Sequence, residues 1–174
     1  VAAEDVGETG GEHRAEAVLL QRPDRVLAGG TGAEVRTGHE HGPAGVWTPP
    51  GRLTSPNKVL WPEQGLTKLQ LARYYADVAE FMLPHVSDRP LTLVRCPAGQ
   101  HKGCFYQKVA HPPLPEGVHP VDVPEGSGGT GIYTYVDSVE GLLGLVQMGV
   151  LEVHVWGSRR DRLERPDQIV FDLD

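Results

Sequence analysis

The hydrophobic period of the chain changes at Pro90, and this change limits the possible folds more than any other feature. Before it, apolar residues recur at the spacing of an amphipathic helix, and Thr67 with Gln70 forms a capping box at the start of that helix. We expect the helix to end at Pro84 or just before it. After Pro90 the apolar residues fall in short β-prone runs bounded by Gly or Pro. These runs are residues 91–95, 105–109 and 132–136.

A second helix and two more strands are predicted near the C-terminus. Residues 137–140 carry a helix-start signal, followed by an apolar stripe at positions 142, 143, 146 and 150. Strands are predicted at 151–156 and 169–174. The Gly-rich segment 126–131 lacks the Gly-Lys-Ser/Thr of a phosphate-binding loop, so we expect a hairpin or a flexible loop there. The whole pattern predicts an α+β fold with a mixed or antiparallel sheet flanked by helices.

Residues 1–50 differ in composition from the rest of the chain. They are rich in Gly, Ala and Glu, and they contain no Phe, Tyr or Lys and a single Trp. Because such a segment can bury little apolar surface, we expect it to be mostly disordered. The folded domain is then expected over residues 51–174, which is long enough for a modest core.

Charge and cysteine usage exclude some classes of protein. The net charge of −7 argues against a protein that coats duplex DNA by bulk positive charge, so any contact with nucleic acid must come from a local patch.

Cys96 and Cys104 fit no zinc-binding spacing and are predicted to be buried or unused thiols. The low cysteine content fits a reducing cytoplasm. The acidic N-terminus has no apolar stretch and no run is long enough to cross a membrane, so we expect a cytoplasmic location without membrane contact.

An apolar run at the end of the chain leads into Asp172-Leu173-Asp174. Side chains alternate between the two faces of a strand, so both aspartates are predicted to point the same way. Two such carboxylates repel each other unless a cation lies between them, and hard oxygen ligands suit Mg²⁺ or Mn²⁺. A pair of these ions can promote phosphoryl transfer. A solvent-exposed strand end with two ordinary aspartates is the alternative.

The run at 151–156 places Glu152, His154 and Trp156 on one face of a strand and two valines on the other. The valine face resembles core, so His154 is predicted to face a cleft or solvent. An isolated histidine is commonly a structural or surface residue. Proximity to the strand with the two aspartates makes His154 a candidate phosphate ligand.

Aromatic residues and lysines supply the remaining candidates. Phe105 and Tyr106 precede Lys108, and adjacent aromatics followed by a cation can stack on bases and hold a phosphate. Lys68 begins the capped helix, where backbone N–H groups favour an anion, and Lys58 lies ten residues before it. The two lysines are a candidate phosphate site. An ordinary strand and two solvated lysines are the alternatives.

Taken in order, these segments resemble the polymerase (primase-like) domain of bacterial DNA ligase D, the multifunctional enzyme of non-homologous end joining. The resemblance extends over residues 51–174, and the order and spacing of its motifs are specific. The motifs are Leu-Thr-Ser-Pro-Asn-Lys-Val-Leu-Trp-Pro at 53–62, Thr67-Lys68, Tyr74-Tyr75, Arg89-Pro90 with Arg95, Phe-Tyr-Gln-Lys at 105–108, Asp137-Ser138, Gln147-Met148-Gly149, Glu-Val-His-Val-Trp at 152–156, and Arg-Pro-Asp at 165–167 leading into 171–174.

The resemblance implies how the reacting groups are held. Asp172 and Asp174 match the paired metal ligands of the family, which implies that they are catalytic and bind Mn²⁺ or Mg²⁺. His154 matches a histidine that contacts the phosphates of the incoming NTP or dNTP. Lys108 and Arg95 fall near the same nucleotide pocket.

The resemblance also implies how DNA is held. Lys58 and Lys68 match two lysines that grip the 5′-phosphate of a DNA break. Phe105 and Tyr106 match an aromatic pair that packs against template bases. The second position of that pair is usually Phe, so Tyr106 is a mild departure.

Further expectations concern the whole protein. The resemblance implies that DNA ends with a 5′-phosphate are its substrates, that Ku and ligase or phosphoesterase domains are its partners, and that the parent protein is also an ATP-dependent DNA ligase. The domain of the family continues past the motif at 171–174 and supplies a third carboxylate, so we expect this chain by itself to be a truncated domain that is inactive as a polymerase. Two other functions stay open. One is a non-catalytic module that binds 5′-phosphorylated DNA ends, and the other is a haloacid-dehalogenase-type phosphatase, whose nucleophile strand also ends in Asp-x-Asp.

Overall fold

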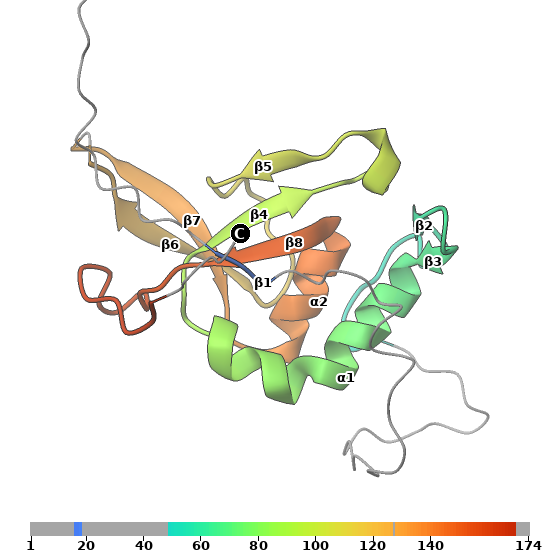
Figure 1. Ribbon diagram of the computed structural model, residues 1–174, viewed down its shortest axis with the longest axis horizontal. Helices are drawn as coiled ribbons and strands as arrows, with labels where there is room; N and C mark the ends of the chain where they lie inside the picture. The colour runs from blue at the N-terminus through green and yellow to red at the C-terminus, as the bar shows by residue number, and fades with distance from the viewer. Residues whose placement is uncertain (1–15, 19–48, 127, 170–174) are drawn as a thin grey trace, which may run out of the picture.

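The computed structural model describes residues 16–18, 49–126 and 128–169 (Figure 1). The predicted metal ligands Asp172 and Asp174 lie outside this part of the chain, as does nearly all of the predicted strand at 169–174. The elements in chain order are β1 (Glu16–Val18), β2 (Val59–Trp61), β3 (Leu66–Thr67), α1 (Lys68–Val86), β4 (Leu91–Arg95), the short 3₁₀ helix η1 (Gln100–Lys102), β5 (Phe105–Gln107), β6 (Val118–Pro124), β7 (Thr130–Val136), α2 (Val139–Gln147) and β8 (Val150–Val155).

The first helix begins where the capping box predicts. The Thr67 side chain accepts a hydrogen bond from Gln70 N at 3.3 Å, and Gln70 Oε1 accepts one from Thr67 N at 2.8 Å. The expected end at Pro84 is wrong, because this proline lies inside the last turn and α1 continues to Val86. Ser87 N still donates to Leu83 O at 2.9 Å, so the last turn keeps its closing hydrogen bond around the proline.

The main sheet has the order β1-β8-β4-β7-β6, and β5 pairs with the C-terminal part of β4. Every strand pair in the described residues is antiparallel, which confirms the α+β prediction. The helices α1 and α2 lie together on one side of the sheet (Figure 1). Both helices and the central strands β4 and β8 contribute to one hydrophobic core, which includes Tyr75, Leu93, Leu142 and Val153.

Strand β6 was not predicted, because Pro120 and Pro124 interrupt its β-prone sequence. Among the strands that the structure describes, β6 pairs only with β7 and so forms an edge of the sheet, where prolines cost few ladder hydrogen bonds. The hairpin expected at the Gly-rich segment is confirmed, since that segment joins β6 to β7. Val150 was expected in the buried stripe of a helix, but Gly149, at φ +77°, ends that helix and Val150 begins β8.

Strand β1 lies within the segment that the sequence predicts to be disordered. Its backbone pairs with β8, and Ala17 lies opposite His154. The other residues before position 49 lie outside the described part of the chain, so the domain boundary at residue 51 stays a prediction. Among the helices that are described, none is long and apolar enough to cross a membrane.

Candidate phosphate and nucleic-acid site

The segment before β2 folds back on the first turn of α1 and brings Lys58 and Lys68 together. Lys68 N donates to Lys58 O at 2.8 Å, and Leu69 N donates to Pro56 O at 2.9 Å. The charge of Lys58 contributes to a lowered pKa of Lys68, after the larger effect of burial. The described residues thus place the two predicted phosphate ligands side by side at a helix N-terminus. A dianion bound there would relieve the repulsion between the two ammonium groups.

Lys68 is not solvated, which was the alternative to a phosphate site in the sequence analysis. Its side chain is buried, at 6% relative exposure, and the ammonium group donates three hydrogen bonds. The acceptors are Thr54 O at 3.1 Å, Gln147 O at 3.2 Å and Gln147 Oε1 at 2.9 Å. All three N–H donors of the ammonium group are therefore used. Sequence reasoning missed Thr54 and Gln147, because nothing local links either residue to Lys68.

Lys58 is exposed and donates from Nζ to Pro97 O, in the loop that joins β4 to β5. The same loop packs closely on β2. Gly99 has φ +101°, and a Cβ atom built on it would lie 3.2 Å from Leu60 O. Lys58 therefore lies between the first turn of α1 and the 97–103 loop.

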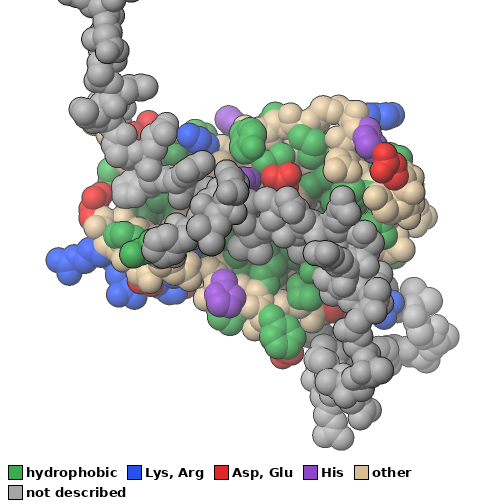
Figure 2. Space-filling model, in the orientation of Figure 1, with side chains coloured by type: hydrophobic (Ala, Val, Ile, Leu, Met, Phe, Trp, Pro, Cys, Tyr) green, Lys and Arg blue, Asp and Glu red, His purple; other side chains and the backbone are tan. Residues whose placement is uncertain are grey.

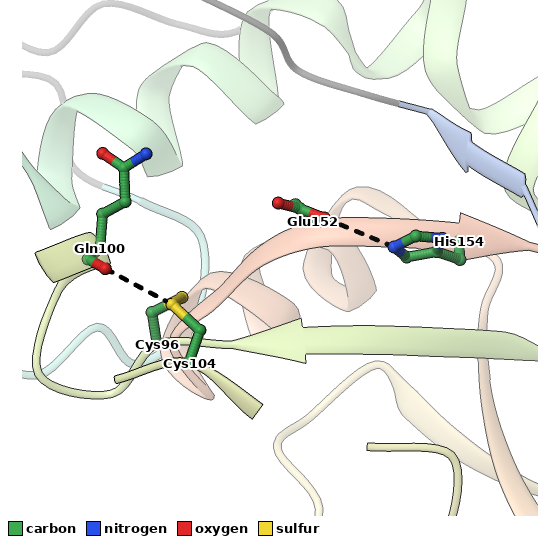
Figure 3. The surroundings of a disulfide bond; sticks show 5 residues. All are labelled: Cys96, Gln100, Cys104, Glu152 and His154. Carbon is green, nitrogen blue, oxygen red and sulfur yellow. Dashed lines mark hydrogen bonds and ion pairs between the residues drawn. A yellow bond between two sulfur atoms is a disulfide. The ribbon is translucent and has the colours of Figure 1, made fainter. Parts of the chain in front are cut away.

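The cysteine prediction is wrong, because Cys96 and Cys104 form a disulfide with a Cα–Cα distance of 4.3 Å (Figure 3). The register of β4 and β5 explains the pairing. Arg95 lies opposite Phe105, so the next residue of one strand and the preceding residue of the other also lie opposite each other. Neighbours of this kind in an antiparallel pair are close enough for a disulfide. The bond closes the loop that holds Pro97, the acceptor for Lys58.

Arg95 and Phe105 lie on the helix side of the β4–β5 hairpin. The Arg95 guanidinium carbon is 5.5 Å from the centre of the Phe105 ring. Arg95 Nε donates to Met148 O at 3.0 Å, and its Nη1 donates to Gln107 Oε1 at 2.7 Å. Arg95 therefore ties β4 and β5 to the C-terminal end of α2. Phe105 keeps 48% of its surface exposed beside this arginine.

His154 lies on the face of the sheet opposite the two helices, as the alternation along its strand predicts, and 16% of its side chain is exposed. The two neighbouring valines are buried, and His154 Nε2 is 3.5 Å from Glu152 Oε2 (Figure 3). Tyr106 reaches the same face, with its ring centre 5.9 Å from that of His154. Phe105 and Tyr106 thus belong to different faces, and only Tyr106 lies with the histidine. Lys108 is exposed just after β5.

The loop 156–169 leads from β8 toward the predicted metal ligands, and buried and half-buried ion pairs hold it. Arg89 is buried and lies 2.7 Å from Asp167 Oδ1, and it also donates to Gly157 O at 2.9 Å. Asp88 accepts from Arg159 Nη2 at 3.0 Å and from Arg160 Nε at 2.7 Å. The hydrogen bond from Arg160 is the largest cause of the lowered pKa of Asp88, and that from Arg89 has the same effect on Asp167.

The described residues contain no group of three or more His, Cys, Asp or Glu side chains that could hold a metal ion. Asp172 and Asp174, the two predicted metal ligands, lie beyond residue 169. Their role with Mn²⁺ or Mg²⁺ therefore stays a prediction from the sequence.

Comparison with known proteins agrees with the resemblance. The family model of the LigD primase-polymerase domain matches residues 67–174. The multifunctional non-homologous end joining protein LigD of Mycolicibacterium smegmatis is 38% identical over 130 residues, which cover 71% of this chain and 16% of that protein. The protein of the same name from Pseudomonas aeruginosa is 37% identical over 123 residues, which cover 71% of this chain and 14% of that protein. The chain therefore spans about one-sixth of the length of these relatives.

Among solved structures, the polymerase domain of Mycobacterium tuberculosis ligase D in complex with DNA superposes with a TM-score of 0.58. It is 40% identical, and the match covers 62% of this chain and 37% of that one. The family model extends over the terminal Asp-x-Asp, which removes the basis of the phosphatase alternative. Because this model matches more than half of the residues, the chain belongs to the LigD primase-polymerase domain family.

Proposed function

We propose that this chain acts in the repair of DNA breaks by non-homologous end joining. In this proposal it binds DNA ends that carry a 5′-phosphate and takes part in template-dependent transfer of NTPs or dNTPs to those ends. The observation that carries the proposal is the pairing of Lys58 with Lys68 at the N-terminus of α1, in a chain of this family. The names of the relatives, which are end-joining proteins, support the same assignment.

The first step of the proposed function is the capture of a 5′-phosphate. The exposed ammonium group of Lys58 is the direct ligand, because it needs to exchange only its contact with Pro97 O. Lys68 adds a second positive charge behind it, and the dipole of α1 favours an anion near its N-terminus, where the N–H groups of Lys68 and Leu69 already bond within the chain. The acidic chain would thus hold DNA through a local site and not through its net charge.

The face of the sheet opposite the two helices is proposed to hold the template and the incoming nucleotide. Tyr106, at 71% exposure, offers a ring on which a base can stack, and His154 lies beside it to contact phosphates. Phe105 offers a second ring at the edge of the hairpin, held by Arg95. Lys108 supplies a further exposed cation near the nucleotide.

Asp172 and Asp174 are proposed to hold Mn²⁺ or Mg²⁺, and such an ion would stabilise the charge that develops during phosphoryl transfer. By analogy with the family, Ku and ligase or phosphoesterase domains are the proposed partners, and the cytoplasm is the proposed location.

Binding to two recessed duplexes that differ only in a 5′-phosphate tests the proposal. Fluorescence anisotropy of the 174-residue chain is expected to give tighter binding of the phosphorylated end, with a strong dependence on salt concentration. Equal affinity for the phosphorylated and the hydroxyl end would sink the proposed phosphate site.

A non-catalytic end-binding module is the second candidate, because recognition of a 5′-phosphate by Lys58 and Lys68 needs neither Asp172 nor Asp174. Since this chain by itself is expected to be inactive as a polymerase, primer extension with Mn²⁺ and ribonucleotides separates the two functions only in a longer chain that also supplies the third carboxylate of the family. Extension that stops when Asp172 is replaced by Asn supports nucleotidyl transfer. Phosphate-specific binding without any extension supports the end-binding module.

A further inference from the structure

Gln147 is the last residue of α2, and its side chain connects three separate segments of the chain. Its Oε1 accepts hydrogen bonds from Lys68 Nζ and from Thr54 N, both at 2.9 Å. Its Nε2 donates to Thr54 Oγ1 at 2.7 Å. An ammonium group and a backbone N–H can only donate, so these contacts fix which end of the amide faces Lys68.

These contacts determine where the charge of Lys68 lies. Two of the three acceptors of its ammonium group belong to Gln147, one from the backbone and one from the side chain. A buried ammonium group that loses an acceptor must find another or leave the site, because unpaired burial of a charge is costly. The carbonyl groups at the end of α2 also carry partial negative charge, which favours a cation there. Gln147 therefore keeps Lys68 next to Lys58.

The same helix end supports the neighbouring parts of the site. Gln147 O, Met148 O and Gly149 O are successive carbonyls, and they accept hydrogen bonds from Lys68, from Arg95 Nε and from Cys96 N at 3.2, 3.0 and 2.8 Å. Lys68 bonds both to the backbone carbonyl of Gln147 and to its side-chain amide oxygen. The contacts of Arg95 and Cys96 with this helix end are made to backbone carbonyls. A change in the side chain of Gln147 thus acts on Lys68 and Thr54 and leaves the backbone contacts of the turn in place.

We propose that Gln147 is a positioning residue for recognition of the 5′-phosphate. It holds Lys68 beside Lys58 and fixes the Thr54 segment against α2, so that the two positive charges face one phosphate. This inference rests on the proposed function, in which the chain binds 5′-phosphorylated DNA ends. Loss of the Gln147 amide removes the preference for the phosphate, whereas general affinity for DNA stays.

The test compares the affinities of Gln147→Leu for recessed duplexes with a 5′-phosphate and with a 5′-hydroxyl. The expected result is a fall of about tenfold in the phosphate preference, the size of one lost charge-assisted hydrogen bond, with unchanged affinity for the hydroxyl end. A purely structural role would lower both affinities together or neither. Either of those results, with a folded variant, overturns the proposal.

Gln147→Glu keeps the test decisive if the leucine variant does not fold. The carboxylate retains the acceptors for Lys68 and for Thr54 N, so the fold is expected to remain, but its negative charge offsets one of the two lysines. The phosphate preference is expected to disappear, and its survival would overturn the proposal. Glu140→Gln, an exposed amide-for-carboxylate exchange in the first turn of the same helix, is the matched control and should keep the wild-type preference.

A double-mutant cycle assigns the effect to Lys68. In a Lys68→Met background, Gln147→Leu should cause no further loss of phosphate preference, because the group that it positions is gone. A full additional loss would contradict the proposal that Gln147 acts through Lys68.

The wild-type chain shows whether a negative result concerns the proposed function or only the role of Gln147. If it has no phosphate preference, the proposed function fails, and if it has one that both Gln147 variants keep, only this inference fails.

Discussion

The N-terminal end of α1 and the loop 156–169 both contain closely spaced cations, but the groups that contact these cations differ. At α1, the ammonium groups of Lys58 and Lys68 contact backbone and amide oxygens. Within residues 49–126 and 128–169, neither lysine lies within 4 Å of a carboxylate. In the loop, by contrast, Arg159 and Arg160 share the carboxylate of Asp88.

This difference shows why the number of basic residues is a poor guide to a phosphate site. Figure 2 shows Lys and Arg side chains gathered at the left of the molecule, on the side of the loop that follows β8, with carboxylates among them. The loop contains four arginines, yet Asp88 and Asp161 offset much of their charge. Two lysines paired only with dipoles leave their full charge for an anion. We therefore expect the loop to stabilise the fold and the lysine pair to bind phosphate.

The largest effect is expected from Arg89→Ala, which breaks the buried anchor of the loop. The change removes the ion pair with Asp167 and the hydrogen bond to Gly157 O. Loss of one partner from such a buried network should lower the free energy of unfolding by about 3 kcal/mol, measured by urea denaturation. Arg165→Ala, at an exposed position of the same loop, should change it by less than about 0.5 kcal/mol. Equal effects of the two changes would contradict the buried anchor.

The next largest effect is expected from removal of the disulfide, which lies at the other end of the molecule. The double change Cys96→Ser and Cys104→Ser opens a short loop, and this should lower the free energy of unfolding by about 2 kcal/mol. The same loop carries Pro97, the acceptor for Lys58, so affinity for a 5′-phosphate should fall as well. Dithiothreitol should reproduce both effects in the wild-type chain and have neither effect in the double variant.

Lys58→Gln should affect phosphate binding with almost no effect on stability. Lys58 is exposed, so its loss should cost less than about 0.5 kcal/mol of unfolding free energy. The preference for a 5′-phosphorylated end should fall by about tenfold, because a charge-assisted contact is lost. Lys102→Gln removes an exposed lysine from the adjacent η1 and should leave the preference unchanged. An equal loss in both variants would indicate bulk electrostatics and not a site.

The sequence was sufficient for elements whose signals are local. Thr67 caps the first helix as predicted, and the second helix begins within the predicted start signal at 137–140, with Ser138 as its cap. The run at 91–95 is a strand with the predicted bounds. Strand β6 was missed because its two prolines argue against a strand, and only its edge position, which depends on the order of the whole sheet, makes them acceptable.

The candidate site was predictable in its residue types but not in its contacts. The burial of Lys68 depends on Gln147, which is 79 positions away in the sequence, so no local pattern could reveal it. The disulfide is consistent with a local signal, because the register of the β4–β5 hairpin places Cys96 opposite Cys104. The spacing of the two cysteines fits no metal site, but it fits two residues that face each other across neighbouring strands.

The smallest expected effect is the pH dependence of the arginine-paired loop. Hydrogen bonds from Arg160 and Arg159 lower the pKa of Asp88, so its carboxylate is more stable in the folded chain than in the unfolded one. The resulting stability is present above the unfolded pKa, near pH 4, and is lost as the pH falls through the lowered folded pKa. Asp88→Asn should therefore flatten the fall in stability below about pH 4.

The magnitude of this effect should be modest, because Arg160 is exposed and solvent screens the pair. A difference of about 0.5 kcal/mol between the stability of the wild-type chain and that of Asp88→Asn is expected at neutral pH, and it should shrink toward zero in acid. Asp161→Asn is the matched control, since Asp161 is exposed and its contacts with Arg159 at 3.6 Å and Arg162 at 4.0 Å are longer than those of Asp88. A difference that grows as the pH falls would reverse the sign of the linkage and show that Asp88 does not stabilise the loop through its charge.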